Sequence, residues 1–130
     1  MATWTERELG AIDNAEELTT QTTRRDGSLR DPLIVWGVRH GDDIYVRSVN
    51  GRTAAWFRGV AARHEGRIAA GGVERDITLV ETDKQANEID AAYRDKYRRY
   101  PGIVPNIVSP EARAATLQLV PRDNELRDDT

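Results

Sequence analysis

The sequence predicts an α+β fold in which helices are inserted into a small antiparallel β-barrel. Six segments have strand-like patterning, most of them are joined by glycine-containing hairpin turns, and strands do not alternate with helices as a parallel sheet requires. We therefore expect about six strands, at residues 18–23, 33–40, 44–49, 67–70, 73–81 and 115–120.

The N-terminal helix is predicted from its capping residues. Thr5 stands three residues before Glu8, which is the spacing of a capping box, and Trp4 and Leu9 are placed as a hydrophobic staple. The helix should begin after Thr5 and end near Ala15.

Two longer helices are expected between strands. One should cover residues 53–63 with Thr53 as its N-cap, and the other residues 83–99 with Asp83 as its N-cap. Three prolines between residues 101 and 110 exclude a regular helix there, so we expect only a brief helical turn after Ser109.

Length and composition indicate one domain, which we expect at residues 1–120, followed by a flexible acidic tail at 121–130. The chain has 130 residues and a formal net charge of −3, so no global basic signal points to nucleic acid or to an acidic membrane. It has no cysteine and two histidines far apart in sequence, so we expect no disulfide and no metal site. It also has no signal peptide and no apolar run of about 18 residues, so we expect a cytoplasmic protein.

The predicted strand at 33–40 is apolar on both faces. Leu33 and Val35 would lie on one face, and Ile34, Trp36 and Val38 on the other. A strand buried on both sides has an interior position, and one face could lie under a helix or a partner subunit. We therefore expect a homodimer.

The segment from Asp43 to Val60 is the first candidate site. A strand leads into a tight loop at Asn50, Gly51 and Arg52, followed by a helix start at Thr53. Turns and helix N-termini present free backbone N–H groups that suit a phosphate. The alternative is an ordinary strand-to-helix turn, in which Asn-Gly supplies a positive φ and Thr53 caps the helix.

Two further side chains are candidates for the same concavity. Arg30 begins a strand, where its side chain could turn inward to hold an anion, whereas Arg24 and Arg25 fit a solvated turn. Trp56 could pack against a flat ring system, and its alternative role is core packing.

Four short motifs resemble the FMN-binding and deazaflavin-binding split-barrel proteins. The closest likeness is to an uncharacterised bacterial family, classified as a domain of unknown function, in or near the deazaflavin-dependent nitroreductase group. The likeness extends from about Leu18 to Val120. Its sharpest parts are Arg25–Pro32 (RDGSLRDP), Tyr45–Ser48 (YVRS), Ala55–Phe57 (AWF) and Gly71–Arg75 (GGVER).

This resemblance implies a split antiparallel β-barrel like those of flavin reductases and pyridoxamine-phosphate oxidases, commonly a homodimer, with FMN or a deazaflavin beside the barrel. In the nitroreductases the loop after the third strand and the next helix start bind the cofactor phosphate. That loop usually carries a lysine and two glycines, where this chain has Val49, Asn50 and Gly51. Arg52 and Arg47 are the candidates to replace the cation. The expected cofactor-binding residues are Arg30, Ser48, Asn50, Gly51, Arg52, Ala55 and Trp56.

The predicted function is that of a small flavin- or deazaflavin-dependent oxidoreductase acting on a small molecule. Hydride chemistry would belong to the cofactor, which explains why the sequence carries no acid–base constellation. Two alternatives use the same cleft without a cofactor: a small-molecule binding module, and an isomerase or cyclase.

Overall fold

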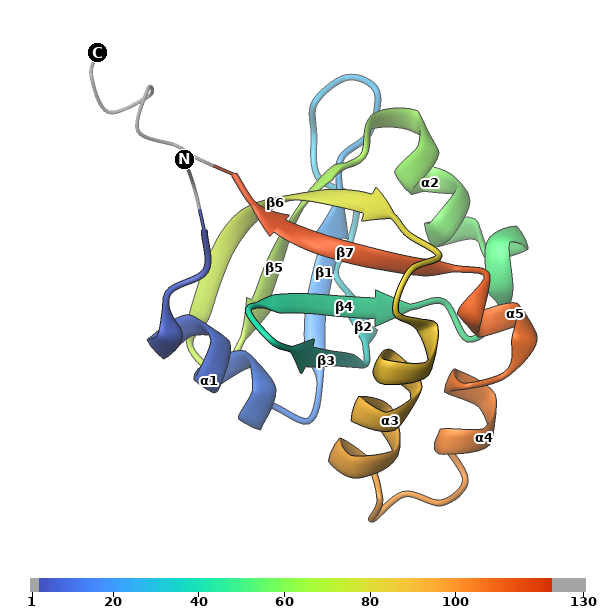
Figure 1. The fold of residues 1–130 in the computed structure, drawn as a ribbon. Helices are drawn as coiled ribbons and strands as arrows, with labels where there is room; N and C mark the ends of the chain where they lie inside the picture. Colours follow the sequence, from blue (N-terminus) through green and yellow to red (C-terminus); the bar gives the residue numbers. More distant parts are fainter. Residues whose placement is uncertain (1–2, 123–130) are drawn as a thin grey trace.

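The chain forms a nearly closed antiparallel barrel in a computed structural model that describes residues 3–122 (Figure 1). Within that range seven strands make one sheet in the order β2-β1-β5-β6-β7-β4-β3. The α+β barrel prediction is confirmed. The strands are β1 (Leu18–Thr22), β2 (Leu33–Val35), β3 (Gly37–His40), β4 (Asp43–Arg47), β5 (Glu65–Ala70), β6 (Val73–Glu81) and β7 (Thr116–Pro121).

The prediction of one continuous strand at 33–40 was wrong. The chain changes partners at Trp36, so β2 pairs with β1 at one edge of the sheet and β3 pairs with β4 at the other. Gly37 permits this crossing, because a Cβ there would lie 2.6 Å from Leu18 Cδ2. The break raises the number of strands from six to seven and brings the two edges of the barrel together.

The expected burial of both faces of this segment is also only partly correct. Val35 and Val38 are buried, but Leu33 is 41% exposed and Ile34 is 57% exposed in the single chain. The homodimer that we inferred from this segment therefore stays a prediction.

Five α-helices and one 3₁₀ turn accompany the strands in the described range. They are α1 (Glu6–Asn14), η1 (Gly51–Thr53), α2 (Ala55–Arg63), α3 (Ala86–Lys96), α4 (Val104–Ile107) and α5 (Pro110–Arg113). The capping box of α1 is confirmed: Thr5 Oγ1 accepts a hydrogen bond from the Glu8 amide, and the Thr5 amide donates to Glu8 Oε1. Ser109 caps α5 as expected.

The predicted N-caps of the two longer helices were wrong. Thr53 belongs to η1, and the N-cap of α2 is Ala54, which makes no side-chain hydrogen bond. The N-cap of α3 is Gln85 rather than Asp83, and its φ of 60° places it in the left-handed region. In both places a turn occupies the residues that we had assigned to the first turn of the helix.

The apolar side chains divide into two clusters. One fills the barrel and includes Phe57 and Val60 of α2. The other lies on the outer face of β3 and β4, where α3 packs against these strands and α4 lies beside α3 (Figure 1). Its buried members are Val38, Tyr45, Ile89, Tyr93, Tyr97 and Ile107.

The expected domain boundary at residue 120 falls inside β7. Pro121 ends that strand, and the Arg122 amide donates a hydrogen bond to the Asp76 carbonyl oxygen at 2.9 Å. The rest of the expected tail lies outside the described residues. Between residues 3 and 122, no helix combines the length and the apolarity that crossing a bilayer requires.

Candidate functional site

Arg47, one candidate for the phosphate-binding cation, is buried in a network of protein groups. Its guanidinium forms an ion pair with Asp90 of α3 and donates to Thr116 Oγ1 at 3.0 Å. Two backbone carbonyl oxygens, of Ile107 and Ala86, accept further hydrogen bonds. Arg47 therefore joins β4, β7, α3 and α4, a role that its place in the sequence did not reveal.

Much of the hydrogen bonding of the loop at 48–51 is internal to the loop. Ser48 is buried, and its hydroxyl donates to the Gly51 carbonyl oxygen at 2.8 Å, while the Gly51 amide donates to the Ser48 carbonyl oxygen. Gly51 has a φ of +78°, which favours glycine. Asn50 is exposed. These groups hold the shape of the turn.

Arg52 lies away from the other predicted cation, Arg30. It makes an ion pair of 2.8 Å with Glu81 and donates to the Ala114 carbonyl oxygen at 3.2 Å. It lines a polar hollow that also includes Thr82 and other residues of the β6–α3 connection. The expected site is thus divided in the structure.

Arg30, Ala55 and Trp56 come together in a groove of about 380 Å³, which we call the α2 groove. It lies where the β1 strand and the loop after it meet the start of α2. Its lining residues are Thr20, Thr22, Arg24, Arg30, Asp31, Pro32, Leu33, Ala55 and Trp56.

Thr20 is the residue of this groove that sequence reasoning missed. It is only 4% exposed, and its hydroxyl has no hydrogen-bond partner among the described residues. A buried polar group without a partner is unfavourable by about 1–3 kcal/mol, so such a group commonly marks a place where a ligand or water completes the bonding. The threonine-rich strand gave no signal to separate Thr20 from its neighbours.

The guanidinium of Arg30 is fixed by hydrogen bonds at the groove, and some of its N–H donors remain available to a ligand. Its Nη1 donates to the Thr23 carbonyl oxygen at 3.1 Å and to Thr22 Oγ1 at 3.4 Å. Within residues 3–122 no carboxylate forms an ion pair with it. Gly59 of α2 gives it room, because a Cβ at that position would lie 3.2 Å from Arg30 Cζ.

The N-terminus of α2 supplies further donors. Ala54 offers no side-chain cap, and the first backbone bond of the helix runs from the Arg58 amide to the Ala54 carbonyl oxygen. The amides of the first turn, at residues 55–57, therefore have no partner within the helix. Ala55 and Trp56 line the groove, so this positive end of the helix dipole lies beside it.

A smaller apolar pocket of about 130 Å³ adjoins the α2 groove and shares Trp56 with it. We call it the tryptophan pocket; its lining residues are Ile34, Val35, Trp36, Arg47, Val49, Trp56 and Ile107. Trp56 thus lines both spaces. It makes an edge-to-face contact with Phe57, with ring centroids 6.1 Å apart.

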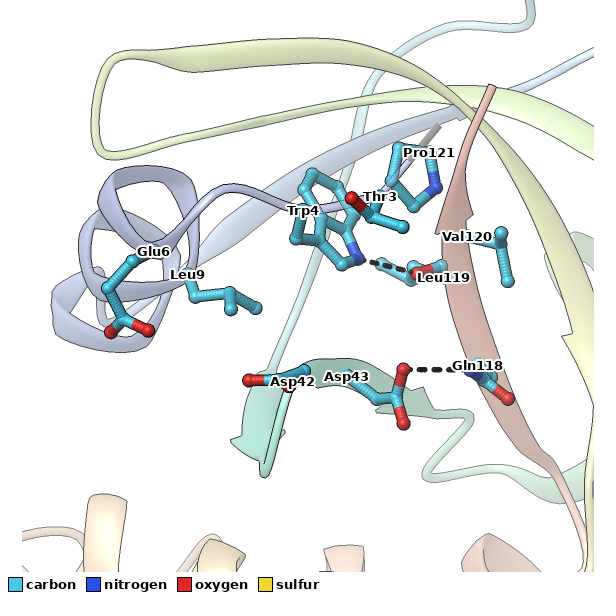
Figure 2. Close-up of a pocket in the computed structure, with 10 residues that line it drawn as sticks. All are labelled: Thr3, Trp4, Glu6, Leu9, Asp42, Asp43, Gln118, Leu119, Val120 and Pro121. Atoms are coloured by element: carbon cyan, nitrogen blue, oxygen red, sulfur yellow. Dashed lines mark hydrogen bonds between the residues drawn. The ribbon is translucent and has the colours of Figure 1, made fainter. Parts of the chain in front are cut away.

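Another pocket, near the N-terminus, has the wrong charge for a phosphate (Figure 2). Its charged lining residues are Glu6, Asp42 and Asp43, and its volume is about 380 Å³. Two of its polar side chains are already engaged, because Trp4 Nε1 donates to the Leu119 carbonyl oxygen and Gln118 donates to Asp43. The carboxylates would repel an anion, so the α2 groove is the better candidate.

Most of the sequence matches one described protein family. A family model for an uncharacterized protein conserved in bacteria, DUF2255, matches residues 8–119. The chain belongs to this family. No curated protein matches it in sequence.

Solved structures resemble this DUF2255 protein in fold. An F420-H2 dependent reductase (FDR-A) has 16% identity and a TM-score of 0.57, over 81% of this chain and 93% of that one. A putative pyridoxamine 5'-phosphate oxidase from Listeria innocua has 11% identity and a TM-score of 0.61, over 91% and 93%. HutZ, the heme storage protein from Vibrio cholerae, has 14% identity and a TM-score of 0.64, over 92% and 91%. The fold is therefore a split β-barrel, as the resemblance implied.

Proposed function

We propose that the α2 groove binds a flavin-type cofactor, FMN or a deazaflavin, and that the protein is a small oxidoreductase. The observation that carries the proposal is the guanidinium of Arg30, which forms no ion pair with any described residue and shares the groove with the start of α2 and with the buried Thr20, whose hydroxyl has no partner within residues 3–122. Neutral, cationic and backbone donors converge there, which is the donor set that a phosphate needs.

The residues of the groove fit the two ends of such a cofactor. Arg30, the Thr20 hydroxyl and the first amides of α2 would hold the phosphate, and the indole of Trp56 would pack against the ring system. The turn at Ser48–Gly51 would hold the start of α2 in position. When bound, the cofactor would supply hydride transfer, and the protein would supply placement and electrostatics.

Haem, which a structural neighbour is named for, fits this groove less well. Haem iron takes an axial histidine, cysteine, methionine or tyrosine, and none of these lines the α2 groove. The two histidines of the chain lie elsewhere, His40 at the end of β3 and His64 at the C-cap of α2. A flavin-type cofactor needs no such ligand.

The experiment is a titration of the purified protein with FMN and with a deazaflavin, followed by cofactor absorbance and tryptophan fluorescence. We expect saturable binding, and we expect Arg30→Gln to weaken it at least about tenfold, because a charge-assisted hydrogen bond contributes about 1.5–3 kcal/mol. Arg52→Gln is the matched control, because Arg52 lies in another hollow. If Arg52→Gln weakens binding and Arg30→Gln does not, the phosphate lies at the 50–52 turn and this assignment is wrong.

The same titration separates the oxidoreductase from the two cofactor-free alternatives. A binding module, or an isomerase or cyclase, would bind neither FMN nor a deazaflavin. Either would still respond, in a thermal-shift screen, to some other anionic small molecule. A protein that binds the cofactor should reduce it with a nicotinamide donor or oxidise its reduced form with a substrate.

We also propose that the protein is a homodimer. Ile34 and Val49, which line the tryptophan pocket, and Leu33, which lines the α2 groove, are exposed apolar side chains, and burying them against a second copy would be favourable. Ile34→Lys should shift sedimentation at micromolar concentration toward the monomer. Val80→Lys, at an exposed valine on β6, is the control; equal behaviour of both variants would count against this interface.

A further inference from the structure

The two segments that form the α2 groove carry a local excess of positive charge in an acidic protein. Of the 19 basic and 22 acidic residues of the chain, residues 19–35 and 54–64 hold five arginines and two aspartates, which leaves 14 basic and 20 acidic residues elsewhere. A charge distribution of this kind attracts anions to one region of the surface. We call the five residues the arginine face: Arg24, Arg25, Arg30, Arg58 and Arg63.

Contacts between the two segments bring these arginines together. At the end of α2, Nη1 of Arg63 donates to the Arg25 carbonyl oxygen at 3.2 Å. A Cβ on Gly59, the residue after Arg58, would lie 3.2 Å from Cζ of Arg30. Arg30 itself lines the α2 groove. The arginine face therefore borders the groove and extends beyond it, along α2 and along the loop between β1 and β2.

Most guanidiniums of the arginine face have no carboxylate paired with them. Arg63 forms an ion pair of 3.1 Å with Glu65, whereas within residues 3–122 the other four arginines form none. Arg25 and Arg58 are exposed, and their side chains make no hydrogen bond to a described residue. Two guanidiniums outside the groove are thus available to an anion that arrives from solvent.

The chemistry of these groups suits a ligand that carries several phosphates. A guanidinium donates two parallel hydrogen bonds to a phosphate, and arginine accommodates the 2′-phosphate of NADP in dinucleotide-binding proteins. A flavin-type cofactor in the α2 groove would need a hydride donor that binds beside it and leaves again. NADPH carries one phosphate more than NADH, so exposed arginines next to the groove favour NADPH.

From these observations we infer that the arginine face binds the phosphate groups of NADPH, through Arg25 and Arg58, beside the α2 groove. The inference rests on the proposed function, because the hydride needs an acceptor. NADPH would give up the hydride from C4 of its nicotinamide and leave as NADP⁺, while the bound cofactor would take up that hydride and one proton from water. Binding of the dinucleotide itself needs no cofactor.

The test is calorimetric titration of the cofactor-free protein with NADP⁺ and with NAD⁺ at low ionic strength. We expect NADP⁺ to bind at least about fivefold more tightly, because the added phosphate meets two arginines and each exposed pair of opposite charges contributes a small amount. The difference should shrink as salt is added. Equal affinity for the two dinucleotides, or no saturable binding of NADP⁺, would overturn the inference.

Matched variants locate the binding. The double variant Arg25→Gln/Arg58→Gln should bind NADP⁺ no more tightly than NAD⁺, and both substitutions lie at exposed positions, so the fold should be kept. Arg94→Gln is the control, because Arg94 is an exposed arginine of α3, a helix that Figure 1 shows well apart from α2. A preference for NADP⁺ that survives the double variant, or that Arg94→Gln removes, would refute the assignment to the arginine face.

A second titration, of the protein saturated with FMN, separates this inference from the proposed function. NADP⁺ should bind as tightly with FMN present as without it, because the two ligands would occupy neighbouring places. Displacement of FMN by NADP⁺ would overturn the inference, since both would then compete for the α2 groove. A protein that binds NADP⁺ through Arg25 and Arg58 but does not bind FMN would contradict the proposed function alone.

Discussion

Replacing Gly59 by alanine should make the protein more stable and its anion site weaker at the same time. Gly59 lies within α2, where glycine is less favourable than alanine by roughly 0.5–1 kcal/mol. The added methyl group would lie 3.2 Å from Cζ and 3.3 Å from Nη1 of Arg30. That separation is tighter than ordinary van der Waals contact, so the arginine must move.

The net effect on stability depends on whether the Arg30 side chain can move away from the new methyl group. The arginine side chain is flexible and partly exposed, so it can withdraw at small cost in folding free energy, whereas its position in the α2 groove is lost. We expect the free energy of unfolding to rise by up to about 1 kcal/mol. We also expect affinity for FMN to fall about tenfold, as expected from loss of one charge-assisted hydrogen bond.

Gly10→Ala provides the matched control. Gly10 lies within α1, and a Cβ there would meet no atom within 4 Å, so this variant should gain helix stability and keep its affinity. Urea denaturation measures the stability and fluorescence titration the affinity. If Gly59→Ala binds FMN as tightly as Gly10→Ala does, Arg30 does not hold the cofactor and the reasoning fails.

Three further predictions concern buried polar groups. Thr20→Val removes a buried hydroxyl that has no described partner, so the free energy of unfolding should rise by about 1 kcal/mol and FMN binding should weaken. A loss of stability would contradict this prediction. Asp90→Asn should lower the unfolding free energy by about 3–5 kcal/mol, because it leaves the buried Arg47 without its ion pair; a loss below 1 kcal/mol would show that the pair matters little. Burial lowers the pKa of Lys96 from 10.5 to about 8, although Asp13 opposes the shift. Between pH 8 and 10.5 the folded chain then binds fewer protons than the unfolded chain, so the free energy of unfolding should rise with pH. The buried tyrosines should oppose this rise above pH 10. Lys96→Met should abolish the rise.

Local signals in the sequence were sufficient for most of the secondary structure. The capping box at Thr5, the glycines at 71–72 and the alternation in β6 each act over a few residues, and each predicted its element correctly. The break at Trp36 was missed because it depends on which strands the flanking residues pair with. The pattern of apolar residues alone cannot distinguish one central strand from two consecutive edge strands.

The candidate site was harder to predict for the same reason. Arg30 and Trp56 were chosen for their chemistry, and the structure brings them together across 26 residues of chain. Arg47 is paired with a residue 43 positions away, and the isolation of the Thr20 hydroxyl is a property of its surroundings. Properties of this kind arise only when distant segments meet.

The position of β7 has a consequence for how the chain can acquire its fold. It is the last strand in sequence among the described residues, yet it pairs with both β6 and β4 inside the sheet order. Without it, the remaining strands would form two separate sheets, β2-β1-β5-β6 and β4-β3. A nascent chain therefore cannot complete the barrel until residues 116–121 are available. Pairings such as Ile44 with Leu119 span most of the sequence, and folding dominated by such contacts is slow.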